Sequence, residues 1–287
     1  MTTTTKNSVF IPEVLADTLP SVFAGRKALY GTGIVVVNPG LDSRSLGEKV
    51  QVPYFNSLGE FEDLATDGDE LTPAELTSAD DESPVLHSGK AFSITKWAQM
   101  AAAGDPYQEA ANQISEGAFR RFDKALIDKA TTTTLIKDLT GEATKTFNWN
   151  GFVEAKLLWG DEQDGMVLMI VHSKVYGDML KEKDEQGRPL LVDMRDGTLP
   201  RYGGIPVAVS DRCKVIPAAG ETPAKYESYI GKKGALALWY NSDFGLDTDK
   251  NILKDSKEAA VHIYYVAHLY RRCAGGTKPG IVKIISH

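Results

Sequence analysis

The sequence predicts an α+β fold, and three features that follow one another along the chain predict it. An acidic segment without a basic residue lies between two strand-like segments, one long amphipathic helix follows, and the remainder alternates strands with shorter helices. The 287 residues are 42% hydrophobic, which is enough to bury a substantial core in one large domain or in two coupled lobes.

The first 28 residues mix polar side chains with scattered apolar ones and predict at most a short helix. Such an arm gains little by folding on itself and becomes ordered mainly by lying on a neighbouring molecule. We expect four of its apolar side chains to make such contacts, namely Phe10, Ile11, Val14 and Leu15. The β-branched run at residues 34–37, between Gly33 and Pro39, predicts the first strand.

An acidic ribbon is predicted next. Residues 50–54 alternate apolar and polar side chains as a strand does, and Pro53 restricts that strand to an edge or to a two-stranded ribbon. Residues 84–95 form a second extended segment. Between the two, residues 60–82 contain ten acids and no Lys or Arg, so they form either a solvated loop or a segment that lies on a basic surface of another molecule.

A two-stranded ribbon is at best marginally stable alone, so we expect something outside the monomer to support this one. The formal charge of the whole chain is −7, and without those ten acids the rest of the chain carries +3. We expect the acidic tip to lie on a basic surface of an adjacent copy of the chain. The acids expected to make that contact are Glu60, Glu62, Asp63, Asp67, Asp69, Glu70 and Glu75.

A long helix is predicted from Asp105 and Pro106 onwards, with Asp as the N-cap and Pro at the first helical position. Apolar residues then recur at spacings of three or four from Tyr107 to Ala130, which predicts about 25 helical residues and a length of about 38 Å. Basic residues gather near its C-terminal end, where the helix dipole favours cations. They are Arg120, Arg121, Lys124 and Lys129.

The remaining chain predicts a compact α/β lobe. Its elements are a helix capped by Asn150, an apolar strand at residues 166–171, a helix at about 175–183, and a hairpin that turns at Gly203 and Gly204. A buried element follows at residues 235–239. The chain then forms a long strand at 261–269, with both faces largely covered, and a final strand at 280–286.

Short motifs that resemble catalytic signatures do not extend to complete sites. Ser93 and Lys96 match S-x-x-K, but the serine lies in a strand-like run and no K-T-G partner exists. Residues 243–245 spell D-F-G without the other kinase motifs, and residues 247–258 resemble a calcium loop with Ile252 where glycine is needed. We expect residues 247–258 to form an acidic turn between strands instead of a calcium site. We expect no enzymatic activity.

Metal and cofactor sites are not predicted either. His262 and His268 lie six residues apart on one strand, about 20 Å, and cannot share a metal. Cys213 and Cys273 are too few for a disulfide framework or a zinc site, so we expect two buried, reduced thiols. The negative net charge argues against a protein whose main function is to bind the phosphate backbone of nucleic acids. No run of about 18 apolar residues indicates a membrane span, and we expect the chain to remain in the cytoplasm where it is made.

The order of these elements resembles the Hong Kong 97-type major capsid protein of tailed bacteriophages along nearly the whole chain. Four segments of the sequence also resemble that family, namely HSGKAFSITK, VLMIVHSKVYGDMLKEKD, RYGGIPVAVSD and FGLDTDKNILKDSKEAAVHIYYVAHLY. The resemblance implies an N-arm and the strand that leads in from it (1–45), an E-loop (46–96), and a spine helix with the first part of the P-domain (97–145). It further implies an A-domain (146–242), P-domain strands (243–272) and a C-terminal strand that returns to the A-domain (273–287).

The resemblance also implies a function. Many copies are expected to assemble through pentamers and hexamers into an icosahedral shell around double-stranded DNA, without sequence-specific binding. Expected partners are further copies of the chain, a portal protein and a scaffolding protein, and the expected location is the virion after assembly in the host cytoplasm. No long helical scaffolding extension precedes the arm, so the scaffold is expected to be separate or absent.

One departure from the founding member concerns covalent crosslinking, which there uses a lysine in the E-loop. This chain has no lysine between Val50 and Gly89, so we expect no such crosslink. Two other functions stay open. An encapsulin-type bacterial compartment would hold cargo protein and no nuclease-protected DNA. A cytosolic α/β hydrolase would be a compact monomer or dimer with a pocket of perturbed titratable residues.

Overall fold

The structure is a computed structural model, and it describes residues 29–38, 48–56, 58, 61, 71–102, 106–141, 144–184, 186–192, 199–220, 223–241, 245–270 and 278–287. The predicted N-cap Asp105, the thiol of Cys273 and the four arm residues predicted to make contacts therefore lie outside the described residues.

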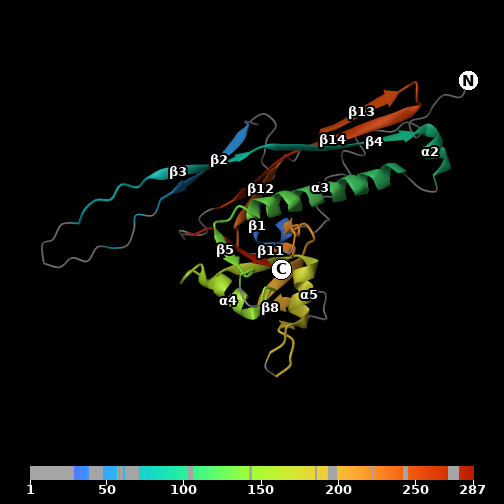
Figure 1. Cartoon of the computed structure of the whole chain (residues 1–287). Coiled ribbons are helices and arrows are strands. Elements are labelled where there is room, and N and C mark those ends of the chain that lie inside the picture. Colours follow the sequence, from blue (N-terminus) through green and yellow to red (C-terminus); the bar gives the residue numbers. More distant parts are fainter. Residues whose placement is uncertain are drawn as a thin grey trace, which may run out of the picture.

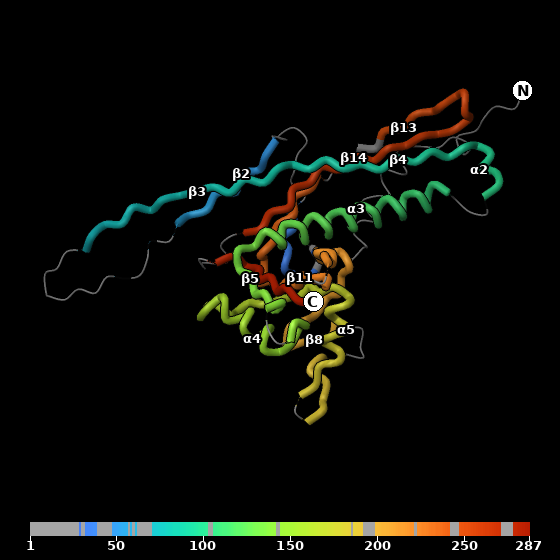
Figure 2. Tube along the Cα trace, in the orientation of Figure 1, coloured from blue at the N-terminus to red at the C-terminus, as the bar shows by residue number. Residues whose placement is uncertain are grey.

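An elongated layer lies over a compact lobe (Figure 1). The layer begins with a ribbon of β2 (Lys49–Phe55) and β3 (Ser78–Pro84), which pair antiparallel from Lys49 opposite Pro84 to Phe55 opposite Ser78. It continues through β4 (Leu86–Thr95) to a short helix, α2 (Lys96–Ala101), which the side chain of Thr95 caps. The ribbon and α2 thus lie at opposite ends of the layer (Figure 2).

The first sheet has β14 (Ser256–Leu269) as its central strand. β4 pairs with β14 along one edge, while β13 (Gly245–Asn251) and then β12 (Leu236–Tyr240) pair along the other, and β1 (Val35–Asn38) continues beyond β12. The short 3-10 helix η2 (Leu29–Thr32) precedes β1. The acidic turn predicted between strands is confirmed at the β13–β14 connection.

The second sheet forms the lobe. Its strand order is β5 (Leu135–Asp138), β15 (Ile281–Ser286), β11 (Lys225–Lys232), β6 (Met166–Val171), β9 (Ile205–Val209), β8 (Arg201–Tyr202) and β7 (Leu191–Val192), and β10 (Val215–Ile216) pairs with β11. The lobe also contains α4 (Trp149–Leu157) and α5 (Ser173–Lys181). The predicted strand 166–171, the hairpin at Gly203 and Gly204 and the final strand are confirmed.

Helix α3 (Pro106–Ala130) confirms the long helix that was predicted from its apolar stripe. It runs between the layer and the lobe (Figure 1). Phe122 and Leu126 are buried in a core that contains Tyr265 of β14 on one side and Ile170 of β6 on the other. Alternate residues of β6 face a second core inside the lobe, built around Trp159 and other aromatic side chains. Because both faces of the second sheet are covered, its strands β6 and β15 are nearly continuous apolar runs.

Two sequence predictions were wrong in detail. Asn148, not Asn150, caps α4, because Asn148 has extended backbone and its side chain accepts a 2.7 Å hydrogen bond from the Gly151 amide, whereas Asn150 lies within the helix. The partner of β2 is β3, not the segment from residue 84 to 95. That segment pairs with β14 over ten residues, so the ribbon instead uses the end of the acidic segment as its second strand.

Candidate assembly surfaces

The ribbon exposes apolar side chains that neither core covers. The side chain of Phe55 at the end of β2 is 69% exposed, and the segment that leads back to β3 exposes Leu71 and Leu76. Leu58 and Phe61 are exposed as well. We call Phe55, Leu58, Phe61, Leu71 and Leu76 the ribbon patch. Large apolar groups gathered on an isolated ribbon are typical of a surface that another molecule covers.

Asp80, Asp81 and Glu82 of β3 add negative charge to the ribbon next to this patch. Lys49 donates a 2.6 Å hydrogen bond to Glu82 across the ribbon, and this contact lowers the pKa of the Glu82 carboxyl and raises that of the Lys49 ammonium. Among the seven acids predicted to make contacts, Glu75 is described and exposed. Glu60, Glu62, Asp63, Asp67, Asp69 and Glu70 lie outside the described residues.

The root of the ribbon is anchored in the body of the molecule. Ser83 of β3 and His268 of β14 are both buried, and Ser83 Oγ lies 2.9 Å from His268 Nδ1. A cavity of about 460 Å³ lies beside this bond, between Tyr54 of the ribbon and the end of α3 at Lys129 and Thr132. The ribbon is therefore held at one end, while β2 and β3 extend away from the body (Figure 2).

A second apolar surface lies at the opposite end of the layer, where α2 meets the β13–β14 turn. The exposed fractions are 78% for Trp97 and 69% for Met100 of α2, and 81% for Ile252 and 98% for Leu253 of the turn. The Lys96 amide donates a 3.0 Å hydrogen bond to the carbonyl of Asp255, which joins the two elements. We call these four exposed residues the distal patch. The sequence analysis did not predict the distal patch. The adjacent apolar residues Ile252 and Leu253 within a predicted acidic turn could have indicated an exposed apolar surface.

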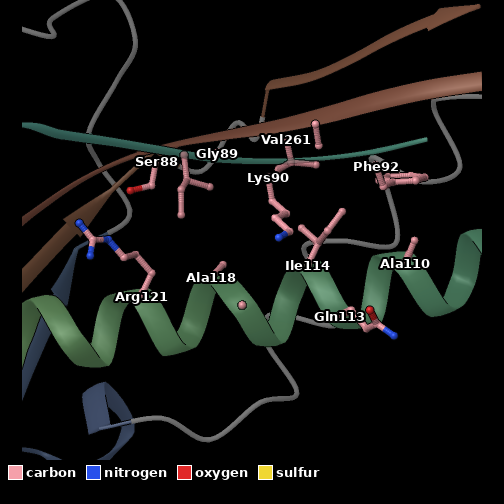
Figure 3. A pocket seen from close by; sticks show the side chains of 13 residues that line it. Ser88, Gly89, Lys90, Phe92, Ala110, Gln113, Ile114, Ala118, Arg121 and Val261 are labelled. Carbon is pink, nitrogen blue, oxygen red and sulfur yellow. The ribbon is translucent and has the colours of Figure 1, made fainter. Parts of the chain in front are cut away.

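A groove of about 480 Å³ runs between α3 and the strands β4 and β14 (Figure 3). Phe92, Ile114 and Val261 form apolar parts of its lining. Lys90 and Arg121 also line it and are exposed to solvent, and no acid is among the residues that line it. This groove combines an apolar floor with two cations, which suits a segment that carries both apolar and acidic side chains.

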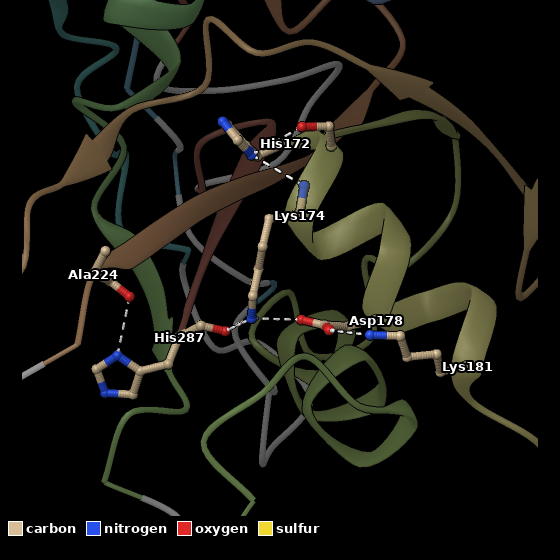
Figure 4. Close-up of polar contacts among 7 residues, drawn as sticks. His172, Lys174, Asp178, Lys181, Ala224 and His287 are labelled. Atoms are coloured by element: carbon tan, nitrogen blue, oxygen red, sulfur yellow. Dashed lines mark hydrogen bonds and ion pairs between the residues drawn. The ribbon is translucent and has the colours of Figure 1, made fainter.

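The lobe contains a polar cluster at the start of α5 (Figure 4). Lys174 Nζ donates to Asp178 Oδ2 at 2.7 Å and also to the carbonyl oxygen of His287, while His287 Nδ1 lies 3.2 Å from the carbonyl oxygen of Ala224. These bonds fasten the chain after β15 to α5. The cluster therefore stabilises the lobe by linking two of its elements.

His172, Ser173 and Asp211 lie beside that cluster without the geometry of a catalytic triad. His172 Nδ1 already accepts the Lys174 amide at 3.1 Å as the cap of α5, and Ser173 Oγ is 3.5 Å from the same nitrogen. A nucleophile and its base need a separation of about 2.6–3.2 Å. The described residues contain no group of three or more His, Cys, Asp or Glu that could hold a metal ion, and none of their helices is long and apolar enough to cross a membrane.

Comparison with known proteins gives one sequence relative and many similar structures. No model of a protein family matches the chain. The major capsid protein of Bacillus phage SPP1 is 22% identical over 244 residues, which cover 80% of this chain and 74% of that protein. The likeness is distant in sequence but extends over most of both chains.

Three solved structures illustrate the similarity of fold. The capsid of Ralstonia phage GP4 has a TM-score of 0.68 at 11% identity and covers 91% of both chains. The capsid of a native GTA particle has a TM-score of 0.66 at 16% identity, with 91% of both chains covered. Microbacterium phage Oxtober96 gives 0.63 at 13% identity and covers 99% of this chain and 95% of its own. Neither the compartment nor the hydrolase interpretation is favoured, and sequence similarity and fold agree on a major capsid protein of the tailed-phage type.

Proposed function

We propose that the chain assembles through pentamers and hexamers into an icosahedral shell that encloses double-stranded DNA. The observation that carries this proposal is the placement of the ribbon patch and the distal patch at opposite ends of an elongated layer, both outside the two cores. A monomer gains nothing from such exposure, whereas a closed shell in which each copy contacts several others can cover both ends. The sequence relative is itself a major capsid protein and two of the similar structures are capsids, which supports the same proposal.

The domain organisation we propose is that of the Hong Kong 97-type fold. Residues 1–45 form the N-arm and its following strand, 46–96 the E-loop, 97–145 the spine helix with the first part of the P-domain, and 146–242 the A-domain. Residues 243–272 return to the P-domain and 273–287 to the A-domain. Most described elements are compatible with this division, since β14 belongs to the elongated layer and β6, β11 and β15 to the lobe. Two strands cross its boundaries, because β12 pairs with β14 of the layer and β5 pairs with β15 of the lobe.

We propose that the acidic tip of one copy lies in the groove of its neighbour. The tip supplies the seven acids named above and the apolar residues of the ribbon patch, while the groove supplies Lys90, Arg121 and an apolar floor. Opposite charges at such a contact favour the correct partner and speed up association. The four apolar arm residues named above would contact another copy in the same way, by covering apolar surface that their own subunit leaves exposed.

The test compares two neighbouring arginines of α3. Arg121→Glu reverses a charge that lines the groove, whereas Arg120→Glu reverses one whose side chain contacts Glu116 of the same helix. We expect Arg121→Glu to abolish or greatly reduce shells seen by negative-stain electron microscopy at physiological salt, and Arg120→Glu to assemble nearly normally. Equal assembly by both variants would contradict the groove contact.

A second test neutralises the acids themselves. Replacing the seven acids by Asn or Gln should weaken shells, while replacing the exposed acids Asp161 and Asp164 of the lobe by Asn should not. Assembly that is unchanged at every salt concentration would contradict the role of the acidic tip. Because the chain has no lysine between Val50 and Gly89, boiled shells should run on a denaturing gel as single chains of 31.3 kDa.

The wider partners follow from the proposed shell. We propose that a portal protein occupies one vertex, that a separate scaffolding protein guides assembly in the host cytoplasm, and that the product is part of the virion. Purified particles should then protect DNA from nuclease. Particles that instead contain a cargo protein and no protected DNA would contradict the DNA-enclosing role while leaving the shell itself in place.

A further inference from the structure

Two histidines meet on the face of the first sheet that points away from α3. In β14, Val261 and Ile263 are buried beneath the sheet, so His262 between them points to the opposite face. The antiparallel register places Tyr264 opposite His87 and His262 opposite Gly89. His87 and His262 are thus diagonal neighbours, and His87 Nε2 lies 3.1 Å from His262 Nδ1.

The neighbours of both rings hold these nitrogens together. Tyr264 stacks on His87, with ring centroids 4.5 Å apart and planes inclined by 13°. Gly89 lies beneath His262, and a Cβ atom at that position would stand 2.9 Å from His262 Nδ1. Only a residue without a side chain leaves the His262 ring where it is. The convergence of the two nitrogens is therefore built into the packing of β4 and β14.

We propose that His87 and His262 form a two-histidine coordination site for a divalent transition metal of the Zn²⁺, Ni²⁺ and Cu²⁺ class. Imidazole nitrogens are ligands that suit these ions. With metal–nitrogen bonds of about 2.0–2.1 Å, nitrogens 3.1 Å apart subtend an angle of about 100° at the metal, which lies between the square-planar and tetrahedral values. Small rotations of the exposed His87 ring and the half-buried His262 ring would aim both lone pairs at one ion.

The charges around the pair favour a cation. The registers of β13 and β14 place Asp247, Asp249 and Glu258 on the same face as His262, and on β4 the same face continues with Gly89, Ala91 and Ser93. These acids do not complete a group of three metal ligands within the described residues. The site thus offers two protein ligands, and water takes the remaining coordination positions.

On binding, the imidazole that now donates to the other must carry that hydrogen on its second ring nitrogen instead. In the metal-free pair one ring nitrogen donates and the other accepts, whereas the ion needs a lone pair from both. An ion at this position would also link β4 to β14, so saturating metal should raise the melting temperature of the protein.

The test uses the untagged full-length chain before assembly, because a histidine tag would bind the same ions. Zn²⁺ affinity is measured by isothermal titration calorimetry, and the nitrogen ligands are counted from the electron paramagnetic resonance spectrum of the Cu²⁺ form. His87→Gln and His262→Gln should each weaken binding by about tenfold or more, since even the loss of an outer-shell partner can cost that much. Gly89→Ala should weaken it as well.

The matched control is His172→Asn, which removes an imidazole at α5 while Asn keeps the helix cap. It should bind like the wild type. Circular dichroism without metal establishes that each variant is folded. Wild-type affinity in folded His262→Gln, or a Cu²⁺ spectrum with a single nitrogen ligand, would overturn the proposal.

Discussion

Lys283 and Glu227 place opposite charges inside the lobe, next to the C-terminal end of α3. Their side chains are 10% and 2% exposed, and Lys283 Nζ lies 3.6 Å from Glu227 Oε1. Lys283 also donates to the carbonyl of Thr131 at 3.1 Å, while the hydroxyl of Tyr229 donates to Glu227 at 2.8 Å. The pair therefore connects the last strand of the lobe to the end of the long helix.

At the residue scale we predict that Lys283→Met destabilises the chain by about 3–5 kcal/mol, because it leaves a buried carboxylate without its partner. Lys137→Met, on the neighbouring strand β5, removes a partly exposed pair with Glu154 of α4 and should cost no more than about 1 kcal/mol. Adding Glu227→Gln to Lys283→Met should recover part of the loss. Urea unfolding of the unassembled protein measures all three, and equal losses for the two lysines would refute this assignment.

Buried tyrosines predict the response to alkaline pH. Burial raises the pKa of Tyr202 and of Tyr229, and the bonds that they donate to Glu182 and Glu227 raise it further. In the unfolded chain each tyrosine ionises near pH 10, whereas the folded protein keeps both protons. Above about pH 10 the unfolded state thus binds fewer protons, and the free energy of unfolding must fall as pH rises.

The expected slope is at most about 1.4 kcal/mol per pH unit for each tyrosine. Cys213 adds a contribution of the same sign, since burial raises the pKa of its thiol to about 12. The double variant Tyr202→Phe, Tyr229→Phe should therefore keep only the smaller slope of the thiol between about pH 10 and 11. Urea unfolding across that range checks this, and a slope equal to that of the wild type would show that the tyrosines ionise equally in both states.

At the element scale, the root of the ribbon sets how firmly β2 and β3 are held. Ser83→Ala removes the buried bond to His268 and leaves the rest of the ribbon pairing in place. We predict that amide hydrogen exchange in β3 rises by about tenfold in the unassembled protein while exchange in α3 is unchanged. Ser78→Ala, at the far end of β3, is the control. Unchanged exchange in Ser83→Ala would mean that strand pairing alone holds the ribbon.

The elements that the sequence predicted well are those whose pattern reflects one buried environment. Helix α3 buries one stripe in the core between the layer and the lobe, so its apolar spacing was sufficient. The register of the ribbon was not predictable, because Asp80, Asp81 and Glu82 read as loop residues and become a strand only through pairing with β2. The true cap of α4 was missed because Asn148 and Asn150 are equally good caps by residue type, and backbone conformation decides between them.

At the scale of the whole molecule, the surfaces were harder to predict than the fold. Acidic residues of the ribbon are visible in the sequence, but the groove joins residues of β4, α3 and β14, and the distal patch joins α2 to a turn more than 150 residues later. His87 and His262 are separated by 175 positions and are brought together by one strand register. Sequence reasoning compared His262 only with His268 and excluded a metal shared by those two, and the structure shows His268 in contact with Ser83.

Assembly is the central claim, and one measurement tests it most directly. The purified chain, alone and co-produced with the proteins encoded beside it, is separated by size-exclusion chromatography across a range of salt and protein concentrations, and the earliest fraction is viewed by negative-stain electron microscopy. We predict rings of five or six copies or closed shells. A uniform monomer or dimer under every condition, including co-production, would contradict the proposed function.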